Sequence, residues 1–409
     1  MSTLKEMVPG SSVPKFAQHL LLTGALMGYL LLTVFSTYWL GELTHHTFGA
    51  DFTIYYEAYQ DARNGGDPYE PYRIGGSYVN HPFVLTLVSA LDWTRQAGVT
   101  LAFWVGLSLL AWIGCLYLVP NLLTSSPFGR FFQDSGLGWV LWLFLGLGFG
   151  PFWETLQIGQ INMFVILAIL LAFWFSEKEQ APAAGLFLAL AVVLKTSPLL
   201  LGIYFLLRGQ WRVVMWTGIF FGLATLGPAL QFSPRIVFQY LNVVSQVGGE
   251  IHPSFYNQSM LSIVFRGREF LGLEDGAASF LVLGHKILMG ATLLATSLVG
   301  YWKLRAKALD RLWWYSLYVL CMVIFSPLVW YHHSVDLLLP LAALFVRPTF
   351  SRIGVVCLFL FQIERVFDWF IRPVALPVLF GHLILLLVML GTVARPNKNI
   401  SSSNHDYSF

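Results

Sequence analysis

The chain has 409 residues, of which 56% are hydrophobic and only 11% are charged, and its mean hydropathy is +0.66. Soluble domains carry about 25% charged residues, so this composition excludes an ordinary soluble protein and indicates an integral membrane protein. The net charge of +3 is small and scattered, which argues against nucleic acid and leaves membrane lipids as the expected surroundings. The apolar runs are long rather than alternating, so we expect an all-α, polytopic bundle.

The chain is predicted to begin with a cytoplasmic tail over residues 1–17, followed by a first span over 18–40. Lys5 and Lys15 precede that span, and the segment lacks the pattern of a cleavable signal peptide. We therefore expect an uncleaved first helix whose N-terminus lies inside, in the plasma (inner) membrane.

Basic residues recur in the short connectors, for example at Arg208 and Arg212. The positive-inside rule places these connectors in the cytoplasm. The two long polar stretches, 41–79 and 232–275, are then extracytoplasmic loops. The Ser- and Asn-rich tail over 395–409 is predicted to be cytoplasmic and disordered.

Within the first loop, residues 52–63 are predicted to form a short helix on the membrane surface. Asn64-Gly65-Gly66 provides its end, and Asp67-Pro68 starts a rigid turn. Asp51 immediately precedes this helix. Its ordinary role would be to cap the helix N-terminus, and its functional role would be that of a carboxylate at a membrane surface. The two roles are compatible.

The remaining chain reads as a series of apolar spans, which gives about twelve spans in a single domain over 18–394. The predicted spans are 80–119 with a polar break at 92–96, 136–149, 161–175, 182–207 with a break at 195–198, 213–231, 277–301, 312–330, 334–346, 353–370 and 374–394. Either 80–119 crosses twice and 182–207 once, or the reverse. We favour the reverse, which places Gln160 and Lys195 toward the outer face.

Ionisable residues at membrane depth are costly, so each is a candidate functional residue. Lys195 precedes Ser197-Pro198, where a broken helix frees polar groups; the competing interpretation is a lysine that snorkels to the interface. His332 and His333 lie at the outer end of a span. One histidine there would be part of an aromatic belt, but two adjacent ones, with Asp336 one turn further on, are less ordinary. No further residue stands at zinc-ligand spacing from them, so no metal site is predicted.

Four uncharged polar residues lie beside apolar spans on the same predicted side of the membrane. Hydrogen bonding between helices is the ordinary role of any one of them, and their shared side favours a common site. They are Gln160, Asn162, Asn257 and Gln258.

Several short motifs, taken in order, resemble glycosyltransferase family 87. The matching motifs are Asp51-Phe52-x-x-Tyr55-Tyr56, Gly65-Gly66-Asp67-Pro68-Tyr69, His81-Pro82-Phe83, Gly159-Gln160-Ile161-Asn162, Leu194-Lys195-Thr196-Ser197-Pro198, Asn257-Gln258-Ser259 and Ser326-Pro327-x-x-Trp330-x-His332-His333. His81 stands where that family often has proline. The likeness covers roughly residues 45–345.

The resemblance implies a GT-C fold and a transferase that uses a polyprenyl-phosphate sugar. Mannose is the default sugar of the family, and a pentose is the alternative. The resemblance also implies that Asp51 is the catalytic base and that the region of His332 and His333 helps to hold the donor or acceptor. The acceptor would be a glycolipid or another glycan.

The chemistry of such a donor suits these residues. Its leaving group is a phosphate, which departs as a stable anion, so one base suffices where glycoside hydrolysis needs two carboxylates. A single displacement inverts the anomeric centre and requires no cofactor or divalent metal. We expect Lys195, His332, His333, Arg372 and Gln160 to bind the donor phosphate. We expect Tyr55, Tyr56, Tyr69, Asn162, Asn257 and Gln258 to contact the sugar or acceptor.

Three other functions fit a polytopic chain with broken helices. A transporter or lipid flippase would move a lipid without reaction. A non-catalytic protein would bind a polyprenyl lipid and tolerate the loss of Asp51. Another lipid-linked transferase, such as an acyltransferase or a polymer ligase, would use a different donor.

Overall fold

The computed structural model describes residues 48–70, 77–123, 136–247, 257–259, 261–262, 265–266, 277–305, 310–326, 328–345 and 376–394, with isolated positions at 24, 28, 130, 353–354, 356–357 and 360. Every regular element within these ranges is a helix, which confirms the predicted all-α class. Most of the predicted spans 18–40 and 353–370, together with the tails 1–17 and 395–409, lie outside the described residues.

The helices follow the order of the predicted apolar runs. They are α3 (Ala50–Arg63), α4 (Phe83–Leu91), α5 (Ala97–Leu122), α7 (Gly136–Leu147), α8 (Gly150–Gln157), α9 (Asn162–Glu177), α10 (Ala181–Leu194), the 3₁₀ helix η1 (Ser197–Leu200), α11 (Leu201–Leu207), α12 (Trp211–Gln231), α13 (Arg235–Val247), α15 (Ala277–Arg305), α16 (Arg311–Ile324), the 3₁₀ helix η2 (Tyr331–Leu337), α17 (Leu338–Phe345) and α19 (Leu376–Ala394).

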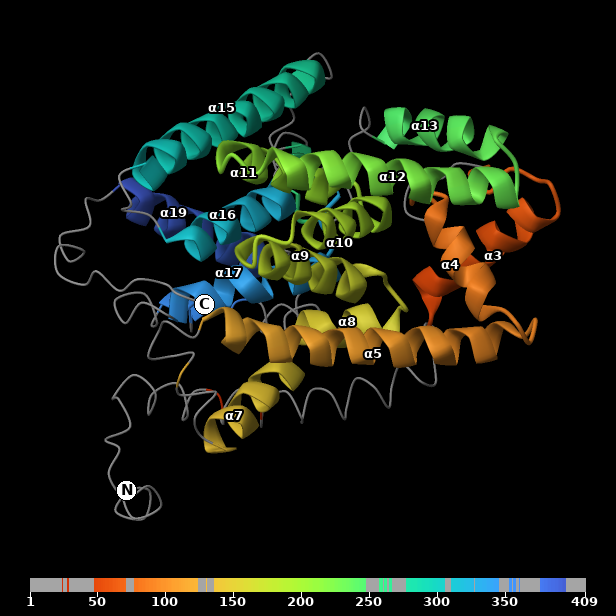
Figure 1. Ribbon diagram of the computed structural model, residues 1–409, viewed down its shortest axis with the longest axis horizontal. Helices are drawn as coiled ribbons and strands as arrows, with labels where there is room; N and C mark the ends of the chain where they lie inside the picture. Colours follow the sequence, from red (N-terminus) through yellow and green to blue (C-terminus); the bar gives the residue numbers. More distant parts are fainter. Residues whose placement is uncertain are drawn as a thin grey trace.

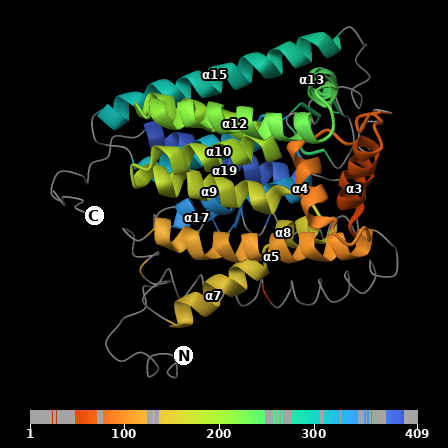
Figure 2. The ribbon, with the colours of Figure 1, turned by 45° about the vertical axis from the view of Figure 1, so that its right-hand side comes forward.

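The centre of the bundle is a hairpin formed by α9 and α10. Helix α12 packs against α10, and α5 packs against α9 (Figures 1 and 2). Gly185 permits the close approach of α10 and α12, because a Cβ there would stand 2.4 Å from the Cβ of Trp216. Helices α3 and α4 lie at one end of the hairpin, while α15 runs along the outer side of the bundle (Figure 1).

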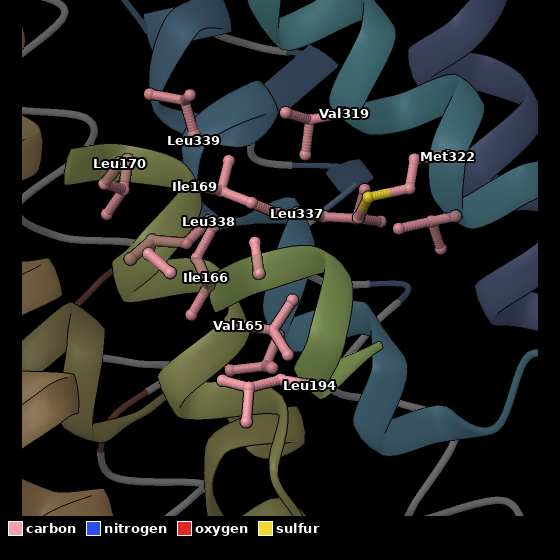
Figure 3. Packing of buried hydrophobic residues seen from close by; sticks show 14 of the residues in the cluster. Val165, Ile166, Ile169, Leu170, Leu194, Val319, Met322, Leu337, Leu338 and Leu339 are labelled. Atoms are coloured by element: carbon pink, nitrogen blue, oxygen red, sulfur yellow. The ribbon is translucent and has the colours of Figure 1, made fainter. Parts of the chain in front are cut away.

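The most enclosed apolar packing lies where the hairpin meets α16, η2 and α17. Val165, Ile169, Val319 and Leu337 are each fully buried there (Figure 3). Helix α9 is apolar around its whole circumference, which is the pattern of a helix enclosed by other helices. This packing fixes the positions of two helix ends that carry polar residues, the start of α9 and the end of α10.

The described residues contain three helices that are long and apolar enough to span a membrane: Ala97–Leu122, Trp211–Gln231 and Phe280–Lys303. A fourth arises if Gly138–Leu147 and Gly150–Gln157, which are bent by 53°, form one broken span. Helices α9, α10 and α16 are apolar but only 14 to 16 residues long. The count of about twelve spans therefore stays a prediction.

Several predicted boundaries are confirmed and others are wrong. The break at 92–96 is present. The break predicted at 195–198 covers only 195 and 196, because the 3₁₀ helix η1 begins at Ser197. Asn64 ends α3, with Gly65 at φ +80°. Helix α7 covers most of the span predicted over 136–149, and a bend of 53° then leads into α8, which begins at Gly150-Pro151. The span predicted over 312–330 ends at Ile324, because Pro327 disfavours helical conformation in the residue before it.

Candidate active site

The site is built around the first turn of α3. Gly49 is the N-cap of this helix, so the prediction that Asp51 caps it is wrong. The backbone N–H of Gly49 donates to the carbonyl of Gln157 at 2.7 Å, and that of Asp51 donates to the carbonyl of Ile158 at 2.9 Å. The free amides at the start of α3 are thus satisfied by the turn that follows α8, and the carboxylate of Asp51 is left for other partners.

That turn approaches α3 closely at Gly159. Gly159 has φ +71°, and a Cβ on it would stand 2.7 Å from the Cβ of Phe52. The indole N–H of Trp104 in α5 donates to the carbonyl of Gly159 at 2.9 Å. Both the left-handed backbone and the close contact require glycine, which gives a physical reason for the Gly159-Gln160 sequence.

Gln160 holds the carboxylate of Asp51. Its Nε2 donates to Oδ2 of Asp51 at 2.6 Å. Its Oε1 accepts from the backbone N–H of Ile161 at 2.7 Å and from the hydroxyl of Tyr55. Since both partners of Oε1 are donors, the orientation of the amide is fixed and its NH₂ group faces Asp51.

Burial raises the pKa of Asp51 above its ordinary value, and the nearby carboxylate of Glu154 raises it further. A positive charge on His332 would act in the opposite direction, as does the hydrogen bond from Gln160. A carboxylate with a raised pKa is a stronger base than a free aspartate, which suits proton abstraction near neutral pH.

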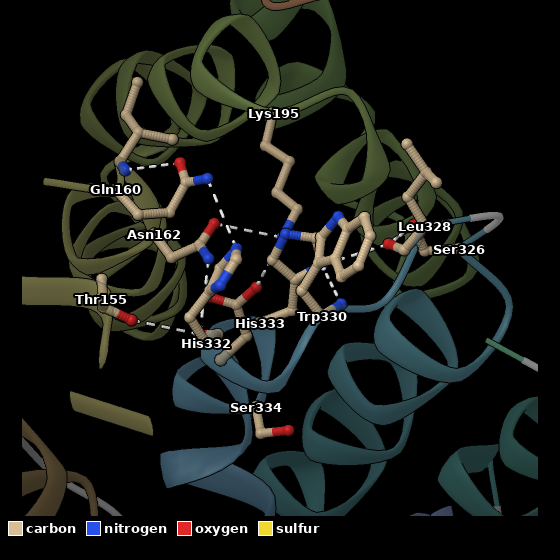
Figure 4. A network of polar contacts seen from close by, with 12 residues as sticks. Thr155, Gln160, Asn162, Lys195, Ser326, Leu328, Trp330, His332, His333 and Ser334 are labelled. Atoms are coloured by element: carbon tan, nitrogen blue, oxygen red, sulfur yellow. Dashed lines mark hydrogen bonds and ion pairs between the residues drawn. The ribbon is translucent and has the colours of Figure 1, made fainter. Parts of the chain in front are cut away.

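His332 lies next to Gln160, on the side of the cluster that also holds Asn162 and Thr155 (Figure 4). Its Nε2 lies 3.4 Å from Nε2 of Gln160, and its Nδ1 lies 3.5 Å from Oε1 of Glu154. Its carbonyl accepts from Nδ2 of Asn162 at 3.4 Å and lies 3.2 Å from Oγ1 of Thr155, which also donates to the carbonyl of Pro151 at 2.7 Å. The side chain and the backbone of His332 are therefore both held by α8 and α9.

Lys195 enters the cluster from the end of α10. Its Nζ donates to Oδ1 of Asn162 at 3.1 Å and lies 3.4 Å from Oδ2 of Asp336, whose side chain is fully buried. The α9–α10 hairpin explains this meeting, because it returns the end of α10 to the start of α9. The ammonium is thus part of a polar cluster between helices (Figure 4).

Of the other predicted site residues, His333 lies beside His332, whereas Asn257 and Gln258 contact the chain before η2. His333 packs edge-on against His332, with ring centroids 4.6 Å apart, and its Nδ1 lies 3.1 Å from the carbonyl of Leu328. Asn257 and Gln258 brace the segment before η2: Oδ1 of Asn257 accepts from the N–H of Val329 at 3.0 Å, and the N–H of Gln258 donates to the carbonyl of Val329 at 2.6 Å.

The tyrosines do not share one position. Tyr55 contacts Gln160 directly, whereas the hydroxyl of Tyr56 donates to Asp92 at 3.1 Å. Tyr69 is buried, and its hydroxyl donates to the carbonyl of Asn80 at 3.1 Å. Their contacts link α3 to α4 and the neighbouring turns. Arg372 lies outside the described residues.

The structure also adds residues that the sequence did not identify as site residues. In the sequence, the one feature that sets Glu154 apart is that it is a carboxylate in the otherwise uncharged segment 147–160. Nothing in the sequence indicates a role for Thr155. Asp336 follows His332 by about one helical turn, but its pairing with Lys195 spans 141 positions of the chain. In the described residues, no three His, Cys, Asp or Glu side chains are grouped to hold a metal ion.

Comparison with known proteins gives one family match and two relatives. The model of the family described as Glycosyltransferase family 87 matches residues 78–327, which include Gln160, Asn162 and Lys195. A relative from Mycolicibacterium smegmatis is named "Polyprenol-phosphate-mannose-dependent alpha-(1-2)-phosphatidylinositol pentamannoside mannosyltransferase". It is 29% identical over 206 residues, covering 49% of this chain and 46% of the relative.

The second relative, from Mycobacterium tuberculosis, is named "Polyprenol-phosphate-mannose-dependent alpha-(1-2)-phosphatidylinositol mannoside mannosyltransferase". It is 26% identical over 336 residues, covering 78% of this chain and 73% of the relative. The chain therefore spans less than half of the first relative's length and most of the second's.

Proposed function

Because this chain belongs to glycosyltransferase family 87, we propose that it transfers a mannosyl group from a polyprenyl-phosphate donor to a hydroxyl of a glycolipid acceptor. The names of the two relatives support both the donor and an acceptor of the phosphatidylinositol mannoside class. The observation that carries the mechanism is the hydrogen bond of 2.6 Å from Gln160 to Asp51, in a cluster that also holds Lys195.

In the proposed reaction, the acceptor hydroxyl oxygen attacks the anomeric carbon of the donor sugar. The bond between that carbon and the phosphate oxygen breaks, and its electron pair leaves with the polyprenyl phosphate. Asp51 takes the hydroxyl proton as the new glycosidic bond forms, and later releases it to water. The displacement inverts the anomeric centre, and it involves no metal ion or cofactor.

The contacts support a division of roles among these residues. Gln160 orients the base, with Oδ2 of Asp51 occupied by its amide, so we assign Oδ1 to the acceptor hydroxyl. Lys195 and Asn162 form the cationic and hydrogen-bonding pair for the donor phosphate. The roles of His333, Arg372, Asn257 and Gln258 toward either substrate stay predictions, as does an active site on the extracytoplasmic face.

The test is transfer by purified protein in nanodiscs. Polyprenyl-phosphate [³H]mannose is supplied with phosphatidylinositol mannosides, and wild type is compared with Asp51→Asn and with Asp61→Asn. Asp61 is an exposed carboxylate at the other end of the same helix, so it controls for the loss of charge. A positioned general base contributes about 10²–10⁴-fold, and we expect a loss of that size for Asp51→Asn alone.

Two outcomes would contradict the proposal. Full activity in Asp51→Asn would remove the general-base role. A folded wild type that transfers no sugar from a panel of polyprenyl-phosphate sugars to any glycolipid would favour a transporter or a lipid-binding protein instead.

A further inference from the structure

Glu154 is a second carboxylate beside Asp51 that the proposed reaction leaves unused. It lies in α8, its side chain is 21% exposed, and Oε1 stands 3.5 Å from Nδ1 of His332. The hydroxyl of the next residue, Thr155, lies 3.2 Å from the carbonyl of the same histidine, beside its shorter bond of 2.7 Å to the carbonyl of Pro151. One turn of α8 thus contacts His332 twice, on the ring and on the backbone.

The protonation pattern around His332 follows from the orientation of Gln160. The Oε1 atom of Gln160 faces two donors, the N–H of Ile161 and the hydroxyl of Tyr55, so its Nε2 is the atom that carries hydrogens. One of those hydrogens goes to Asp51, and Nε2 of His332 lies 3.4 Å from the same nitrogen. If Nε2 of His332 also carried a hydrogen, two N–H donors would face each other. Nε2 of His332 is therefore the acceptor of the second amide hydrogen of Gln160.

The remaining ring proton must then sit on Nδ1, which is the nitrogen that faces Glu154. This carboxylate–imidazole–amide order is the arrangement by which an outer carboxylate fixes the tautomer and orientation of a functional histidine. Here the histidine does not contact the reacting atoms. It contacts the amide that holds the base.

We propose that Glu154 is a positioning residue that holds His332 as its neutral Nδ1–H tautomer, so that Nε2 locks the Gln160 amide and, through it, the Asp51 carboxylate. The inference rests on the proposed function and assigns His332 to orienting the base rather than to binding the donor phosphate.

Charged and titratable groups approach the ring from four parts of the chain. Glu154 faces it from α8 and Asp51 from α3, while Asp336 and His333 belong to its own 3₁₀ helix and Lys195 comes from the end of α10. Lys195 is already paired with Asp336. Glu154 contacts a nitrogen of the ring itself, with Oε1 at 3.5 Å from Nδ1 of His332. We therefore assign to Glu154 the role of holding the ring proton on Nδ1.

The kinetic test compares Glu154→Leu, which removes the acceptor atom, with Glu154→Gln, which keeps an acceptor oxygen but loses the charge. Removing an orienting partner typically costs 10–100-fold, so we expect kcat to fall by about that factor in Glu154→Leu, with little change in the KM for donor. Glu154→Gln should stay within about fivefold of wild type, on the same principle that the acceptor is retained. Glu57→Leu, at an exposed position of α3, is the matched control and should leave kcat unchanged.

A double-mutant cycle with His332→Ala supplies the second criterion. If Glu154 acts through His332, Glu154→Leu adds no further loss in the His332→Ala background. Additive losses, a change confined to the KM for donor, or a Glu154→Gln variant as poor as Glu154→Leu would each overturn the proposal.

A third measurement does not depend on turnover. ¹⁵N NMR of histidine-labelled wild type in nanodiscs, with His332 assigned by its loss in His332→Ala, should show a protonated Nδ1 and an unprotonated Nε2. A proton on Nε2 in the wild type would refute the inference. An inactive wild type with the expected tautomer would instead count against the mannosyl-transfer function alone.

Discussion

Gly159 offers the sharpest test of how the site is positioned. In Gly159→Ala, the new Cβ would stand 2.7 Å from the Cβ of Phe52, while carbon atoms in good contact are about 3.5–4.0 Å apart. Phe52 follows Asp51 in the first turn of α3, and its Cβ cannot move without its backbone. The substitution must therefore shift the start of α3 by about 1 Å, the difference between these two separations.

The magnitude has two parts. Alanine at φ +71° costs about 1–2 kcal/mol, because its Cβ crowds the following carbonyl in the left-handed conformation. Overpacking against Phe52 adds about 1–3 kcal/mol. For catalysis, a misplacement of about 1 Å can cost about 10²-fold, so we expect kcat to fall by roughly that factor.

Gly209 provides the matched control. It has φ +74°, but a Cβ there would meet nothing within 4 Å. Gly209→Ala should therefore lower the free energy of unfolding only through the backbone conformation. We expect its kcat within about twofold of wild type, because nothing near the site moves. Both variants are measured by mannosyl transfer and by thermal unfolding in the same detergent. A folded Gly159→Ala protein with wild-type kcat would refute the claim that this contact positions Asp51.

Four further predictions concern Asp51, Gln160, Lys195 and Trp104. Because the pKa of Asp51 is raised, chiefly by burial, the acid limb of kcat against pH should lie above the value of about 3.9 for a free aspartate, with activity lost as pH falls through it. The hydrogen bond from Gln160 favours the charged carboxylate, so Gln160→Ala should move this limb to higher pH, and a limb that moves down would contradict the assignment. Lys195→Met alone should lower the unfolding temperature, because it leaves Asp336 buried without its partner. The double variant Lys195→Met/Asp336→Asn should recover that stability, because Asp336 no longer carries a charge. Its KM for donor should be about 10–100-fold above that of Asp336→Asn. An equal KM in these two variants would show that Lys195 has no part in binding the phosphate. Trp104→Phe and Trp142→Phe each remove an indole hydrogen bond to a carbonyl, at 2.9 Å and 2.6 Å, and each leaves a cavity in the core, so each should cost more unfolding free energy than the hydrogen bond alone, which contributes about 1 kcal/mol. Only Trp104→Phe should reduce kcat, since its partner is Gly159; equal activities of the two variants would argue against this role.

The pH prediction has a counterpart in stability. A carboxylate with a raised pKa in the folded state opposes folding once it is ionised, so stability is lost as pH rises through that pKa. Asp51→Asn should consequently unfold at no lower a temperature than wild type at pH 7. This makes it a clean variant for the transfer assay, because its loss of activity would not reflect misfolding.

The sequence by itself determined the class of the protein and the approximate positions of its helices. Long apolar runs, glycines and prolines influence the conformation of the residues next to them. The helix predicted over 52–63, the break at Lys195 and the all-α class could therefore be read from residues near one another in the chain. The motif residues Asp51, Gln160 and Lys195 were also identified in advance as candidates for one site.

Only the tertiary structure decided which of these residues meet. Asp51 contacts Gln160 across 109 positions, and His332 contacts Glu154 across 178. Such pairs leave no periodic signal, because a side-chain partner far along the chain is set by how helices pack and not by spacing. For the same reason Asp51 proved to lie inside the first turn rather than to cap it, Asn257 proved to brace the backbone at Val329, and Glu154 emerged as a member of the site.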